Sequence, residues 1–237
     1  MIGICGLRKR FGQLDVLQGV DATFATGRVT ALVGPNAAGK TTLIKTILGL
    51  TKPDEGSVTV DGTVVNGDVS YRRRIGYMPQ IARFPGNLTG EELLSMLEKL
   101  RTDVAKPDRS LIATFGLEAE LGKQLRTLSG GTRQKVNAVA AFLFSPDVLI
   151  LDEPTAGLDP RASSALKDRI LADGARGRTF IVTSHVMAEL EEVADDVIFL
   201  ADGQVRFSGS LDNLKEMTLQ VNLERAIAEL MTRGKAA

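Results

Sequence analysis

Apolar runs of strand length alternate along the chain with stretches in which apolar side chains recur at helical spacing. Near-continuous apolar runs at 29–33, 147–152 and 179–184 are typical of strands that are covered on both faces. Helical spacing occurs at 39–50, directly after the first of these runs, and again at 223–231. This alternation predicts an α/β fold with a mainly parallel sheet.

Two hairpins are predicted where an aspartate–glycine pair interrupts a strand pattern. One lies at 57–65 and the other at 196–209, and an Asp-Gly pair is a strong signal for a tight turn between antiparallel strands. The first 30 residues also have the pattern of short antiparallel strands, with turns at Gly12 and Gly27. We therefore expect an antiparallel unit beside the parallel sheet.

A helical insertion is predicted between a strand at 75–80 and the motif LSGG at 128–131. The pattern is helical from Thr89 to Arg126, and Thr89 is expected to cap the first helix of this segment.

Composition and charge exclude several classes of function. The 29 basic and 29 acidic residues cancel and tryptophan is absent, which argues against a nucleic-acid partner. The single cysteine, Cys5, excludes an internal disulfide. The apolar stretch at 138–144 is far shorter than the roughly 20 residues that span a bilayer, and the first residues lack the pattern of a secretory signal. We expect a soluble chain that reaches a membrane only through a partner.

The stretch GPNAAGKTT at 34–42 fits the phosphate-loop pattern GxxxxGK[ST] between a predicted strand and a predicted helix. In such a loop, backbone N–H groups and the helix N-terminus surround a phosphate with partial positive charge. Lys40 is expected to reach the β- and γ-phosphates, and Thr41 to coordinate Mg²⁺. A glycine-rich turn without function is the alternative, which this context disfavours. The expected contact residues are Gly34, Pro35, Asn36, Ala37, Ala38, Gly39, Lys40, Thr41 and Thr42.

Two carboxylates, Asp152 and Glu153, follow a buried strand, at the edge where ligands bind in open α/β sheets. Asp152 is expected to hold the Mg²⁺ shell, and Glu153 to orient or deprotonate an attacking water. The alternative is that both residues simply end a strand at the solvent, which the phosphate loop makes a weak explanation. The chain has no NKxD-type tetrad, which disfavours a GTPase.

A second stretch with the composition of a phosphate loop, LSGGTRQK, occupies 128–135. Together with LILDEPTAGLD at 149–159 and His185 after a strand, it resembles the nucleotide-binding domain of ATP-binding cassette (ABC) proteins. The resemblance covers roughly residues 1–210. It implies a P-loop NTPase (RecA-like) core with an antiparallel β-subdomain and an inserted helical subdomain at about 81–146. A C-terminal helical extension would occupy 211–237.

The resemblance gives the second loop a role. In this family two domains face each other head to tail, so that Ser129, Gly130 and Gly131 of one would contact the γ-phosphate held by Lys40 of the other. The cofactors implied are ATP and Mg²⁺. The partner across ATP would be a second copy of the chain or a different, paired cassette.

Four further positions match the family. Phe11 would stack on adenine, although taken alone it is more readily a core residue. Gln80 would reach Mg²⁺ and the attacking water, and Asp159 would link the two sites of the dimer. His185 would contact the γ-phosphate. The resemblance therefore implies the catalytic residues Glu153, His185 and Gln80 and the metal ligands Thr41, Gln80 and Asp152.

Two positions depart from the family pattern. Ala37 stands where glycine is usual, at a cost of order 1 kcal/mol if its φ is positive. Thr132 replaces the usual glutamine after LSGG, which bears on contact with the opposite nucleotide. Neither change removes a catalytic group, so we expect an active ATPase.

The resemblance implies the ATPase subunit of a membrane transporter, bound to separate transmembrane permease subunits. Such a subunit would be cytoplasmic and peripheral at the inner face of the cell membrane. Phe84, Leu88 and Leu93 are candidates for the groove that receives the permease, with internal packing as their equal alternative. The stretch at 71–89 is similar to the exporter-type branch, within it to ATPases of copper-site maturation in nitrous oxide reductase. The alternative function is a soluble ABC-type ATPase for cofactor assembly, such as iron–sulfur cluster building.

Overall fold

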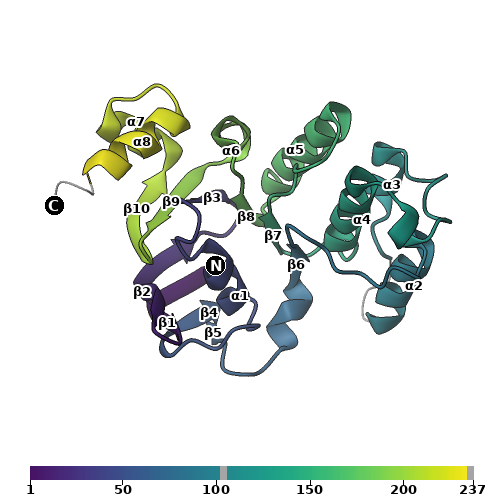
Figure 1. The fold of residues 1–237 in the computed structure, drawn as a ribbon, viewed down its shortest axis with the longest axis horizontal. Coiled ribbons are helices and arrows are strands. Elements are labelled where there is room, and N and C mark those ends of the chain that lie inside the picture. Colours follow the sequence, from purple (N-terminus) through teal and green to yellow (C-terminus); the bar gives the residue numbers. More distant parts are fainter. Residues whose placement is uncertain (102–105, 234–237) are drawn as a thin grey trace.

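The computed structural model describes residues 1–101 and 106–233. Within them the strands form two sheets, with the orders β2-β1-β4-β5 and β10-β9-β3-β8-β7-β6 (Figure 1). The first sheet is antiparallel throughout. Its strands are β1 (Ile2–Phe11), β2 (Leu14–Phe24), β4 (Glu55–Val60) and β5 (Thr63–Val64). The predicted antiparallel unit and the hairpin at Asp61-Gly62 are both confirmed.

The second sheet is parallel except for its edge strand β10, which pairs antiparallel with β9. Its strands are β3 (Val29–Val33), β6 (Ile75–Met78), β7 (Val148–Asp152), β8 (Thr179–Thr183), β9 (Asp196–Ala201) and β10 (Gln204–Ser210). The three apolar runs predicted as strands covered on both faces are β3, β7 and β8, and all their residues are buried. In β7, Ile150 packs into one hydrophobic cluster, whereas Leu149 and Leu151 pack into the other.

The helices cover both faces of this sheet. On one face, the helix α1 (Lys40–Ile47) packs into a hydrophobic cluster that also contains side chains of the antiparallel sheet. The opposite face is covered by α4 (Gly130–Phe142), α5 (Pro160–Gly174), α6 (Met187–Val193), α7 (Leu211–Thr218) and α8 (Leu223–Arg233). This layered arrangement confirms the predicted α/β fold of a P-loop NTPase with an antiparallel sheet.

The inserted segment contains α2 (Gly90–Leu100) and α3 (Ser110–Phe115), which lie beside α4 on the far side of β6 from the antiparallel sheet (Figure 1). Thr89 begins α2 as predicted: its hydroxyl accepts from the N–H of Glu92, whose carboxylate accepts from the N–H of Thr89. The rest of the predicted helical run contains one short 3₁₀ turn, η2 (Leu125–Thr127). Residues 102–105 of that run lie outside the described residues.

The structure differs from the expectation at one helix boundary. The predicted helix at 39–50 ends at Ile47, because Gly49 takes a left-handed conformation and side chains from η1 (Ser70–Arg74) bind the terminal carbonyls. Tyr71 donates to the Ile47 carbonyl, and Arg72 donates to the carbonyls of Leu48 and Gly49.

The C-terminal extension predicted for 211–237 contains α7 and α8, and its last four residues lie outside the described part. The boundaries proposed at residues 81, 146 and 210 stay predictions. None of the helices in the described part of the chain combines the length and hydropathy that a bilayer span requires.

Candidate functional site

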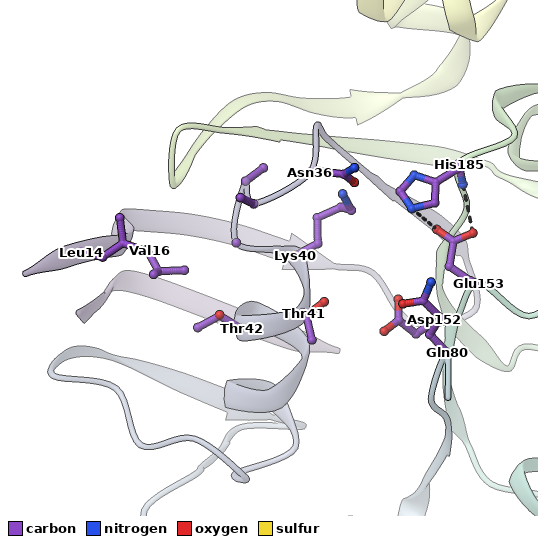
Figure 2. A pocket seen from close by; sticks show the side chains of 13 residues that line it. Leu14, Val16, Asn36, Lys40, Thr41, Thr42, Gln80, Asp152, Glu153 and His185 are labelled. Carbon is purple, nitrogen blue, oxygen red and sulfur yellow. Dashed lines mark hydrogen bonds and ion pairs between the residues drawn. The ribbon is translucent and has the colours of Figure 1, made fainter. Parts of the chain in front are cut away.

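A pocket of about 280 Å³ lies where the loop after β3 faces the carboxyl ends of β6, β7 and β8 (Figure 2). Parallel strands bring their carboxyl ends to one edge of a sheet, so residues distant in sequence meet there. The lining residues are Leu14, Val16, Asn36, Ala37, Ala38, Gly39, Lys40, Thr41, Thr42, Gln80, Asp152, Glu153 and His185. The pocket therefore brings together most of the predicted phosphate loop and all the predicted catalytic and metal-binding residues.

The phosphate loop has the backbone that its sequence requires. Gly39 has φ 105°, and a Cβ at Gly34 would lie 2.1 Å from the Leu200 carbonyl oxygen, so both positions need glycine. Ala37 has φ 64°, which fulfils the condition for the predicted strain of about 1 kcal/mol. Lys40 donates from Nζ to the carbonyls of Gly34, at 2.6 Å, and Pro35, at 3.0 Å.

The ammonium group of Lys40 is partly buried and interacts with the negative charges of Glu153 and Asp152. Burial lowers the pKa of Lys40, and the negative charges of Glu153 and Asp152 oppose that change. Figure 2 shows Lys40 across the pocket from Glu153 and His185, with Thr41 and Asp152 below them. An anion placed between these groups would replace the two carbonyls as the partner of the ammonium group.

Thr183 positions both carboxylates at the end of β7. Its hydroxyl donates to Asp152 Oδ1 at 2.6 Å and accepts from the Glu153 N–H at 3.1 Å. All three residues are buried, and Glu153 has φ 53°, a conformation that residues with side chains adopt only under outside constraint. Thr183 was not among the predicted site residues, and it lies near the end of the strand predicted at 179–184.

Glu153 and His185 form a pair. The His185 N–H donates to Glu153 Oε2 at 3.1 Å, and His185 Nε2 lies 3.4 Å from Glu153 Oε1 (Figure 2). The imidazole is 57% exposed and the carboxylate 9% exposed, so the histidine closes the solvent side of a nearly buried acid. A carboxylate in this place can accept a proton from a water in the pocket.

Oxygen donors suited to a magnesium ion lie in the same pocket. Asp152 contributes a carboxylate, Gln80 an amide and Thr41 a hydroxyl. Magnesium prefers hard oxygen ligands and keeps positions for water and phosphate, so one carboxylate with two neutral groups fits it.

Seven predicted contact residues do not line this pocket, and two of them, Gly34 and Pro35, belong to the phosphate loop itself. Phe11 is 52% exposed, and Lys9 Nζ lies 5.3 Å from the centroid of its ring. This exposure shows that the alternative interpretation of Phe11 as a core residue is wrong. Leu14 and Val16, which the sequence analysis did not select, stand in the lining instead. The remaining four are Ser129, Gly130, Gly131 and Asp159.

Those four residues lie at the beginnings of two other helices. Ser129 caps α4, accepting from the Thr132 N–H at 3.1 Å, and its hydroxyl lies 2.8 Å from the Thr132 hydroxyl. Asp159 caps α5 and forms an ion pair with Lys135 at 2.6 Å. Ser129, Gly130 and Asp159 are exposed to solvent in the single chain.

The fold and the pocket together define a P-loop nucleoside triphosphatase. The family model described as ABC transporter matches residues 17–156, and the chain belongs to this family. It is 35% identical over 240 residues to the daunorubicin resistance ATP-binding protein DrrA3 of Streptomyces coeruleorubidus, covering 99% of this chain and 76% of that protein. It is 32% identical over 209 residues to the Nod factor export ATP-binding protein I of Ralstonia nicotianae, covering 86% of this chain and 65% of that protein.

Solved structures agree with this assignment. The structure of an ATP-binding subunit of an ABC transporter superposes with a TM-score of 0.88 at 30% identity, covering 98% of this chain and 99% of the other. The fold is also that of a dimeric ATP-binding cassette in a post-hydrolysis state with ADP and Pi, with a TM-score of 0.78 at 24% identity and coverage of 89% and 99%. The chain is thus an ATP-binding ABC ATPase of the transporter type. The alternative of a soluble assembly ATPase is not supported by these relatives.

Proposed function

We propose that two cassettes, either two copies of this chain or this chain and a paired one, close head to tail around two ATP molecules and drive export through separate permease subunits. The observation that supports the dimer is that the two elements proposed to bind phosphate, the loop with Lys40 and the LSGG motif, lie apart in one chain. Lys40 and Thr41 line the pocket, whereas Ser129 and Gly130 are exposed at the beginning of α4, outside it. A second cassette would bring an equivalent helix N-terminus to the open side of the pocket.

Different residues of this site would bind the phosphates, hold Mg²⁺ and accept the proton of water. Lys40 and the N–H groups of the loop would bind the phosphates, and Thr41, Gln80 and Asp152 would hold Mg²⁺. The ion, when bound, supplies positive charge to the phosphate oxygens. Glu153 would take the proton of the attacking water, with His185 beside it toward the γ-phosphate.

Export is supported by the names of the relatives, one of which acts in Nod factor export and another in daunorubicin resistance. The substrate of this chain is left open by those names, and the copper-site maturation branch stays a prediction. We place the chain in the cytoplasm, at the inner face of the membrane, because its proposed partners span the bilayer and ATP is on that side.

A second pocket of about 280 Å³, here called the groove, is suited to the permease. It lies between β6, α2 and α4, and its lining includes Tyr77, Pro79, Phe84, Leu97 and Phe144. The groove adjoins Gln80, and the neighbouring Ile81 is 71% exposed. An apolar segment of a permease could therefore pack against Phe84 and Ile81 and contact the loop that carries Gln80.

Only one of the three residues predicted for this groove lines it. Phe84 does, whereas Leu93 is 1% exposed within the core and Leu88 is half-buried against that core. The alternative interpretation, internal packing, is confirmed for Leu93.

The test is recovery of the chain from detergent-solubilised membranes of its own cell. We expect the wild type to co-purify with a partner that spans the membrane several times, and Phe84→Asp together with Ile81→Asp to abolish that recovery. Leu219→Asp is the matched control, because Leu219 is 89% exposed on the other side of the molecule, between α7 and α8. Co-purification with soluble partners alone, or recovery unaffected by the double variant, would show that the proposal is wrong.

A further inference from the structure

Two buried polar side chains of α4 have no part in the site described so far. Gln134 is 8% exposed and Asn137 is 1% exposed, and they follow the LSGG motif on the helix that this motif begins. Their neighbours Val136, Ala138 and Val139 are apolar and fully buried. A buried amide is unfavourable unless it is hydrogen-bonded, so the partners of these two side chains are informative.

Those partners are the two loops that carry Glu153 and Gln80. Gln134 Nε2 donates to the backbone carbonyl of Glu153 at 3.3 Å. Asn137 Nδ2 donates to the carbonyl of Pro79, the residue before Gln80, at 2.9 Å. Asn137 Nδ2 also lies 3.3 Å from Gln134 Oε1, which joins the two amides, three residues apart on one face of the helix, into one chain.

The bond to Glu153 acts on a strained residue. Glu153 has φ 53°, and its N–H is held by the carbonyl and hydroxyl oxygens of Thr183. Its carbonyl is held by Gln134 and by the N–H of Ala156. Left-handed conformations of residues with side chains persist only where the surroundings fix them, and Gln134 supplies one of these constraints from a different element.

We propose that Gln134 and Asn137 are positioning residues that fix Glu153 and Gln80 relative to α4. This inference rests on the proposed roles of Glu153 and Gln80. Because α4 begins with Ser129, a shift of this helix toward the nucleotide of the opposite cassette moves the two catalytic loops of its own chain. Asn137 also lines the groove, so a permease segment seated there would act on the same amide. The hydrogen-bonded pair Gln134 and Asn137, here called the relay, thus connects the LSGG end of α4 and the groove to the loops that carry Glu153 and Gln80.

The test combines Asn137→Leu and Gln134→Met, which keep the size of each side chain and remove its donor, with Gln80→Ala. Thr218→Val is the matched control, since Thr218 is also buried and its hydroxyl donates to the Leu214 carbonyl in α7, remote from the pocket. We expect Asn137→Leu and Gln134→Met to lower kcat about tenfold and to change the Kd for ATP less than twofold. Thr218→Val should leave both unchanged.

The decisive comparison is the double variant. If Asn137 acts through Gln80, Asn137→Leu lowers kcat less than twofold in the Gln80→Ala background. The same tenfold loss in both backgrounds, or an unchanged kcat in both single variants, would overturn the relay. Asn137→Ala replaces Asn137→Leu if the larger side chain prevents folding.

A failure of the proposed function would look different. If Gln80→Ala alone leaves kcat unchanged, the proposed role of Gln80 is wrong, and Gln134→Met then decides the relay through Glu153. A tenfold lower kcat for that variant supports it, and an unchanged kcat overturns it.

Discussion

Thr132 is the departure from the family pattern that most directly touches the proposed composite site. Its hydroxyl lies 2.8 Å from the Ser129 hydroxyl, and its N–H donates to the same oxygen. The serine that is proposed to bind the opposite γ-phosphate is therefore already engaged within its own chain. Either hydroxyl can be the donor of this pair, and a phosphate oxygen that accepts from Ser129 competes with Thr132 when Ser129 is the donor.

Thr132→Val tests that competition. Valine keeps the shape of the side chain and the backbone cap but frees the Ser129 hydroxyl, so we expect ATP-driven dimerisation to tighten about threefold to tenfold. The measurement is sedimentation over a range of protein concentrations with ATP and Mg²⁺. Thr114→Val is the control, because that hydroxyl donates within the helical insertion to the Ser110 carbonyl. Dimerisation that is unchanged or weaker would mean that the Thr132 hydroxyl does not compete with phosphate for the Ser129 hydroxyl.

At the scale of elements, one arginine connects the inserted helices to the core. Arg169 of α5 donates to Asp108, which precedes α3, at 2.6 Å, and to the fully buried Asp173 at 2.7 Å. Its guanidinium lies 5.2 Å from the centroid of the Phe142 ring in α4. Burial alone would raise the pKa of Asp108, but hydrogen bonds from Ser110 and Arg169 outweigh it and lower the pKa to about 2.

Asp108→Asn should therefore reduce the free energy of unfolding in a pH-dependent way. Because folding lowers the Asp108 pKa from 3.8 to about 2, its contribution is present above pH 4 and is lost as the pH falls through 2. We expect a deficit of about 2 kcal/mol at pH 7 that shrinks to about half by pH 3. Urea unfolding of wild type and variant at both pH values measures it. A deficit independent of pH would show that the charge of Asp108 contributes nothing.

The sequence predicted the elements whose patterns have one physical cause. The strands β3, β7 and β8 are mostly apolar because both of their faces are buried, and the Asp-Gly pairs supply the left-handed residues of two turns. The end of α1 could not be predicted in this way, since Tyr71 and Arg72 bind its carbonyls from a distant segment.

In the candidate site, too, the features set by local sequence were predicted, and those set by contacts between distant residues were not. The phosphate loop and the pair Asp152 and Glu153 follow from local sequence, and the parallel strand order brings them to one pocket. Thr183 and Gln134 were missed because their contribution is a hydrogen bond to a residue about 20 to 30 positions away. Such contacts depend on strand neighbours and helix packing, which carry no motif.

At the scale of the whole molecule, the two elements proposed to bind phosphate do not line one pocket. Lys40 lies in the pocket, and Ser129 is exposed at the beginning of α4. The central claim is therefore that the complete site forms only when two cassettes close around ATP and that Glu153 then hydrolyses it.

Sedimentation of Glu153→Gln with ATP and Mg²⁺ tests this claim most directly. Glutamine keeps the shape of the side chain but cannot accept the proton of the attacking water, so ATP binds and hydrolysis stops. The account predicts a stable ATP-bound dimer of the variant and a kcat lowered at least about 100-fold. A variant that stays monomeric with ATP and Mg²⁺ and hydrolyses ATP at the wild-type rate would contradict the account.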